Sequence, residues 1–168
     1  MIATLMALAL LQADPVSCHE VAAKERLTCG RRAVEAAEAR VAEFDVTDCA
    51  EAMTTLEMNA CGALDLARAE EQMFKYLDAA LERAGLSDQE ATGPEPVESA
   101  RYLEASQIAW AEYANQACLA VYEDVKGGTI RTIVWLGCRL ELTQARTHTI
   151  WANHLTYWND SPPVLPEP

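Results

Sequence analysis

Six cysteines are the residues of this chain whose type and spacing most clearly point to chemistry. They are Cys18, Cys29, Cys49, Cys61, Cys118 and Cys138. None lies in a Cys-x-x-Cys arrangement, and no histidine shares a helical face with a cysteine pair, so neither a redox motif nor a zinc site is predicted. In an exported chain an even number of cysteines indicates a disulfide framework, and three bonds among six cysteines allow 15 pairings.

The spacing favours one pairing for the first four cysteines. Segments 18–30 and 49–62 both begin with cysteine, carry glutamate two positions later, and close with Cys-Gly before an alanine-rich helix. Either this similarity is a chance product of Ala/Glu-rich sequence, or the segments are repeats that form Cys18–Cys29 and Cys49–Cys61. Cysteines 11 or 12 positions apart in one straight helix would be about 17 Å apart. A disulfide needs Cα atoms within about 7 Å, so each segment must fold back on itself.

Other catalytic arrangements are missing from the sequence. There is no Gly-x-Ser-x-Gly, no His-Glu-x-x-His and no phosphate-binding glycine loop. The carboxylate pairs Glu70-Glu71 and Glu123-Asp124 are adjacent in sequence and cannot face each other on a helix, which favours a solvated acidic surface. We therefore expect a protein that is not an enzyme, with no catalytic residue, no cofactor and no metal.

Cys118 and Cys138 lie on the two arms of a predicted helical hairpin that begins at Tyr102. Apolar or buried positions recur in steps of three and four in each arm, the period of a helix. They are Leu103, Gln107, Trp110, Ala114, Ala117 and Val121, then Ile133, Gly137, Leu140, Gln144, Thr147 and Trp151. Between the arms, Gly127-Gly128 offers the permissive backbone of a reversal. A Cys118–Cys138 disulfide would join the arms as an antiparallel pair.

Composition and charge limit the fold and the partner. Hydrophobic residues make up 51% of 168 residues, and alanine, leucine and glutamate favour helices. We predict an all-α fold, a small disulfide-stapled helical bundle with a central antiparallel hairpin. The net charge of −13 excludes nucleic acid as the main ligand and disfavours an anionic membrane surface. Either a basic protein is the partner or the acidity serves only solubility; the oligomeric state is not specified.

Four short motifs follow one another along residues 48–155. They are Met58-Asn59-x-Cys61, Gln107-x-x-Trp110-x-x-Tyr113 before Cys118, Gly127-Gly128-Thr129, and Cys138 followed by Leu142-Thr143-x-x-Arg146. In order and spacing they resemble the LprI-like family, small secreted bacterial domains named after a lysozyme inhibitor. The chain departs from the family at Ile108, where members often carry a basic residue, and at Ala114-Asn115, where they carry Arg-Asp. Gln107 and Arg146 are expected to be structural hydrogen-bonding residues.

The resemblance implies an exported binding protein that inhibits a lysozyme-type muramidase. The segment most suited to insertion into an enzyme cleft is the turn formed by Gly127, Gly128, Thr129, Ile130 and Arg131. The alternative is a cell-envelope interaction module with a different partner, and an unrecognised enzyme is the third possibility.

The domain plan follows from the same features. Residues 1–13 are uncharged and apolar, which indicates a signal peptide cleaved after Ala13 and a periplasmic or secreted product without membrane insertion. Residues 14–45 form an N-terminal helical extension, the degenerate repeat, and residues 46–158 form the LprI-like domain. Within it, a long helix over 64–83 ends at Gly85 and a Gly/Pro-rich linker covers 87–97. Residues 159–168 are expected to be an unstructured tail.

Overall fold

The computed structural model describes residues 17–44, 48–159 and 161–168, and every element of regular secondary structure in these ranges is a helix. Four α-helices follow in order: α1 Ala23–Ala42, α2 Thr55–Glu90, α3 Ser99–Asp124 and α4 Arg131–Ile150. A short 3₁₀ helix, η1 Cys49–Glu51, precedes α2, and a π-helical turn, η2 Trp151–Leu155, follows α4. The predicted all-α bundle is confirmed. The expected signal peptide lies outside the described residues, as does the expected boundary at residue 45.

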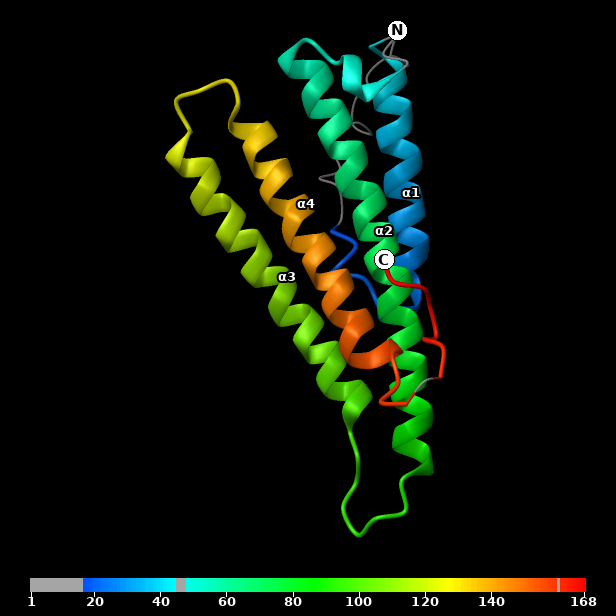
Figure 1. Cartoon of the computed structure of the whole chain (residues 1–168). Helices are drawn as coiled ribbons and strands as arrows, with labels where there is room; N and C mark the ends of the chain where they lie inside the picture. Colours follow the sequence, from blue (N-terminus) through cyan, green and yellow to red (C-terminus); the bar gives the residue numbers. More distant parts are fainter. Residues whose placement is uncertain (1–16, 45–47, 160) are drawn as a thin grey trace, which may run out of the picture.

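The long helix α2 is the centre of the bundle, because α1, α3 and α4 all pack on it. Figure 1 shows α1 along one side of α2 and the α3–α4 hairpin along another. The main core contains the fully buried Met73, Phe74, Leu77 and Ala80 of α2, together with side chains of α3, α4 and η2. A second cluster between α1 and the start of α2 is built on Val41, Ala60, Cys61 and Leu64.

Three disulfides join Cys18 to Cys29, Cys49 to Cys61, and Cys118 to Cys138, each with a Cα–Cα distance of 5.6 Å. These are the three pairs that the spacing predicts. Cys18 lies in a turn before α1 and Cys49 in η1, while their partners lie inside α1 and α2. Each segment therefore folds back as the distance limit of a disulfide requires.

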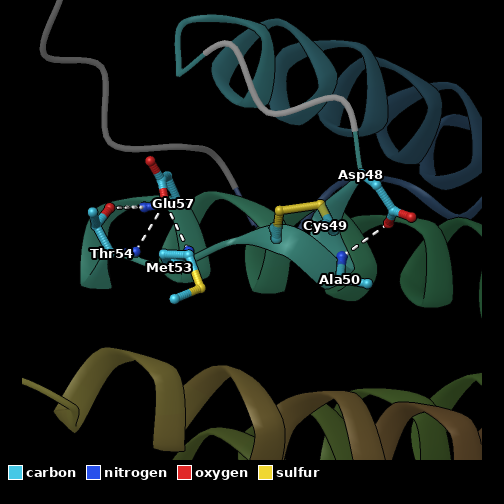
Figure 2. Close-up of a disulfide and its surroundings, with 7 residues drawn as sticks. Asp48, Cys49, Ala50, Met53, Thr54 and Glu57 are labelled. Atoms are coloured by element: carbon cyan, nitrogen blue, oxygen red, sulfur yellow. Dashed lines mark hydrogen bonds between the residues drawn. A yellow bond between two sulfur atoms is a disulfide. The ribbon is translucent and has the colours of Figure 1, made fainter.

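The start of α2 is fixed by a capping box next to the second disulfide. The Thr54 hydroxyl accepts a hydrogen bond from the Glu57 amide at 3.2 Å. The Glu57 carboxylate accepts from the amides of Met53 and Thr54, both at 2.8 Å (Figure 2). Because these amides point out of the helix start, the reciprocal bonds satisfy donors that the helix itself leaves unpaired.

We predicted that the long helix ends at Gly85, but α2 continues to Glu90. A glycine inside a helix costs only about 1 kcal/mol, and the extra turn has a structural role. Its Asp88 carboxylate accepts hydrogen bonds from the Ala100 amide at 2.9 Å and the Ser99 amide at 3.0 Å. These hydrogen bonds lower the pKa of Asp88, and the bond from the Ala100 amide has the largest effect. The last turn of α2 thus caps the start of α3 across the linker.

Residues 161–168 belong to the segment that we expected to be an unstructured tail. They form no helix or strand, but Leu165 packs against the main core. The Leu165 carbonyl accepts from the Trp151 indole at 3.0 Å, and the Pro166 carbonyl accepts from the Tyr76 hydroxyl at 2.8 Å. A buried tyrosine or tryptophan needs a partner for its polar group, and the tail supplies both partners.

Candidate functional site

The predicted insertion segment is an exposed turn between α3 and α4. Residues 126–131 are all exposed, and the turn is held by the Gly128 amide donating to the Val125 carbonyl at 2.8 Å. Neither Gly127 nor Gly128 has the left-handed φ that only glycine adopts easily, so the reversal does not depend on their backbone freedom. The Cys118–Cys138 disulfide joins the helices below the turn. The turn therefore connects two helices that a disulfide cross-links.

The side chains of the turn combine an apolar and a cationic group. Ile130 is 51% exposed. Arg131 donates to the Lys126 carbonyl at 3.2 Å, and its guanidinium carbon lies 5.9 Å from the centre of the Tyr122 ring. Lys126 pairs with Glu123 at 2.8 Å on the exposed surface. A protruding apolar residue beside an oriented arginine can contact a cleft that contains carboxylates.

Further exposed apolar side chains lie at the same end of the bundle. Met53 and Leu56, beside and within the first turn of α2, are both exposed. The helices α2 and α4 run in the same direction, and Gly62 of α2 meets Leu136 of α4. The start of α2 is therefore at the end of the bundle where the turn also lies (Figure 1). We call this end, with Met53, Leu56, Ile130 and Arg131, the tip.

A buried polar cluster connects three parts of the chain below the tip. Glu70 of α2 accepts a hydrogen bond from Arg139 of α4 at 2.9 Å, and His19 lies 3.4 Å from the same carboxylate oxygen. The side chains of His19 and Arg139 are 8% and 9% exposed. The His19 ring also packs on Phe74 and Trp110, with centroid distances of 5.1 and 5.7 Å. The cluster therefore anchors the N-terminal turn to the bundle.

The charges of this cluster determine the pKa of Glu70. Burial alone would raise the pKa, but the hydrogen bond and charge of His19 and the charge and hydrogen bond of Arg139 outweigh it, so the pKa is lowered. Because the folded pKa lies below the unfolded one, the stabilisation from Glu70 is complete above the unfolded pKa, about 4.3. It is lost as the pH falls through the folded value.

Because the folded protein lowers the pKa of Glu70, acid titration tests its contribution to stability. Between about pH 6 and pH 3 the free energy of unfolding should fall in the native chain. It should fall less steeply in Glu70→Gln, because the variant has no carboxylate at this position to become protonated. Urea unfolding at a series of pH values measures both slopes. Other carboxylates titrate in both proteins, so the test compares the difference between the two slopes of unfolding free energy against pH. Equal slopes would mean that Glu70 is not held ionised by its partners.

The residues of the sequence motifs are mostly interior or interhelical. The Gln107 amide accepts from Arg146 of α4 at 3.0 Å and donates to the sulfur of Met73 at 3.6 Å, so it links three helices. Arg146 also donates to the Ser106 hydroxyl at 2.8 Å. Trp110 packs against the main core, whereas Tyr113 is exposed.

Two motif residues lie near the start of α2. Met58 is partly exposed there. The side-chain oxygen of Asn59 is buried and has no hydrogen-bond partner among the described residues. The structure does not bring the motif residues together into one surface with the turn.

Sequence reasoning missed the His19–Glu70–Arg139 cluster. Glu70 was expected on a solvated acidic face, and this is wrong because its carboxylate is tied to Arg139 and largely covered. The sequence pattern bears on the histidines only through metal binding and gives no role to His19. The one available signal was its position next to Cys18, since a disulfide holds its neighbour against the bundle. In the described part of the chain no group of three or more His, Cys, Asp or Glu side chains is placed to hold a metal ion.

Comparison with known proteins gives one match. The family model described as "Lysozyme inhibitor LprI" matches residues 47–150, which include η1, all of α2 to α4 and two of the three disulfides. No curated protein and no solved structure matches the chain. Among the helices of the described residues, none is both long enough and apolar enough to cross a membrane.

Proposed function

Because the chain belongs to the LprI family of lysozyme inhibitors, we propose that it binds a lysozyme-type muramidase and blocks turnover of cell-wall substrate. The observation that carries the proposal is the family match over residues 47–150, which covers the stapled hairpin and the exposed turn. An inhibitor needs no catalytic group of its own. It needs only a surface that fits the enzyme and remains in place.

The charge of the protein supports this partner. The chain has 26 acidic and 13 basic residues, and lysozymes are often strongly basic. Opposite net charges raise the association rate by steering the two proteins together, and salt screens this steering. Close to the enzyme the local charges matter instead. Retaining muramidases carry two carboxyl groups about 5 Å apart in the cleft, and Arg131 at the tip would meet them with a cation.

The rigidity of the tip supports insertion of the turn. Ordering a loop on binding costs free energy, and a turn whose two helices are cross-linked at Cys118–Cys138 loses little freedom. Ile130 would contribute apolar contact, and Met53 and Leu56, which are exposed at the same end of the bundle, would extend it at the rim of the complex. Export follows as part of the same proposal, since three disulfides persist in a periplasmic or extracellular compartment.

A pair of matched variants tests the role of the tip. Ile130→Asp should weaken inhibition of lysozyme at least about tenfold, because it places a charge in the apolar centre of the interface. The control is Leu86→Asp, which also places a charge at an aliphatic side chain of similar exposure, 55% against 51%, near the C-terminal end of α2. The measurement is the rate of cell-wall lysis against inhibitor concentration, with lysozymes of several classes. Equal loss in both variants, or none in Ile130→Asp, would remove the turn from the interface.

A further inference from the structure

A hollow of about 390 Å³ lies beside the His19–Glu70–Arg139 cluster, away from the tip. Its walls are the N-terminal turn with Ser17, His19 and Glu20, the stretch of α3 from Ile108 to Asn115, and Arg139 of α4. The volume falls within the range of small-ligand sites, about 300–1,000 Å³. From Glu112 to the end of α3 is about 18 Å of helix, so this hollow and the turn are separate places on the protein.

The buried wall of the hollow presents an unused hydrogen-bond acceptor. Glu70 is ionised and can only accept, so Nε2 of His19 must be the donor in their contact. In the tautomer whose single proton is on Nε2, a lone pair remains on Nδ1. That atom is buried and has no hydrogen-bond partner among the described residues. An acceptor in this position is costly unless a donor reaches it.

The open wall of the hollow presents negative charge. Glu20 and Glu112 are both exposed at its mouth, and neither forms an ion pair within the described residues. Glu112 accepts only from Gln116 of its own helix, at 3.0 Å. On the buried side the charge of Arg139 is balanced by Glu70 at 2.9 Å. The Nε of Arg139 also lacks a partner there, but an anion that reached it would face the two free carboxylates.

We propose that this hollow binds an alkyl-guanidinium group, the side chain of an arginine of the partner protein. The guanidinium carries five donors in a plane, which suits acceptors on several walls: Nδ1 of His19 and the carboxylates of Glu20 and Glu112. The apolar Ile108 and Ala111, one helical turn apart on α3, would cover the alkyl stem. The inference rests on the proposed function only in taking the arginine from a basic lysozyme.

A small probe tests the site without any lysozyme. The oxidised full chain is titrated at about pH 8 with Nα-acetyl-arginine amide, a cation without a carboxylate. Nitrogen–proton correlation NMR should show saturable shifts at residues 17–20, 108–115 and 139. Glu112→Gln and Glu20→Gln should each weaken binding about threefold to tenfold, and Glu90→Gln, at the far end of α2, should not.

The neutral Nα-acetyl-leucine amide and the anion acetate are the controls. Saturable shifts with the arginine probe alone support the site. No saturation with that probe, or equal shifts with either control, overturns it. If lysozyme is inhibited but the probe does not bind, this inference fails and the proposed function stands. If the probe binds but no lysozyme is inhibited, the site stands and the proposed function fails.

Discussion

Replacing Glu104 by alanine is expected to lower the free energy of unfolding by about 3 kcal/mol. Glu104 of α3 accepts two hydrogen bonds from the Arg26 guanidinium of α1, at 2.9 and 2.5 Å. The Arg26 side chain is only 3% exposed, so removal of its partner leaves a buried charge without compensation. The estimate is at the low end for such a pair because Glu104 is 31% exposed and Asp78 remains nearby.

The comparison variants separate the buried charge from other effects. Glu38→Ala removes another interhelical ion pair, Arg68–Glu38, whose side chains are both more than half exposed, and it should cost no more than about 1 kcal/mol. Arg26→Met combined with Glu104→Met removes both charges and should recover much of the loss. Urea unfolding followed by circular dichroism measures all of them. If Glu104→Ala costs no more than Glu38→Ala, the pair does not connect α1 to α3 in the way described.

Replacing Cys118 and Cys138 by alanine together is expected to lower the free energy of unfolding by about 3 kcal/mol. The two cysteines are 20 positions apart, and closing a loop of that length removes chain entropy mainly from the unfolded state. The unfolded chain should therefore expose more surface without the bond, and the dependence of unfolding free energy on urea should steepen. Inhibition should weaken too, since the turn loses its cross-linked base.

The outcome of the disulfide experiment has two parts. A fall in stability with an unchanged urea slope would place the loss in the folded state, for example in a cavity at the fully buried Cys118. An unchanged stability would contradict the structural role of the bond. Lysozyme inhibition is measured at a temperature where both proteins are folded, so that a change in inhibition reports the presentation of the turn.

The disulfides and the helical hairpin could be predicted because they leave local patterns. Cysteine spacings of 11 and 12 forbid one straight helix, and steps of three and four residues mark the arms around Gly127-Gly128. Helix ends were harder. The long helix was predicted to end at Gly85, yet α2 continues to Glu90, and α4 ends at Ile150, where the chain turns through η2. There Arg83 of α2 donates to the carbonyls of His154 and Thr156, at 2.6 and 3.0 Å.

The contacts that sequence reasoning missed join residues far apart in the chain. His19 and Glu70 are 51 positions apart, Glu70 and Arg139 are 69 apart, and Tyr76 and Pro166 are 90 apart. Helical period says which face a residue occupies but not which charged residue of another helix it meets. The adjacent residues Glu70 and Glu71 are both glutamates, so the sequence does not indicate which of them is buried. Only the packing of α4 on α2 places Arg139 against Glu70.

Calorimetric titration of the oxidised protein into lysozymes of several classes tests the central claim most directly. The account predicts binding to at least one of them at a stoichiometry of one. It also predicts that affinity falls between about 0.1 M and about 1 M salt, as the Debye length shortens from about 10 Å to about 3 Å. Retained one-to-one binding by Leu86→Asp and weaker binding by Ile130→Asp would place the enzyme at the tip. Absence of binding to every lysozyme at micromolar concentrations of the native, oxidised chain would contradict the proposed function.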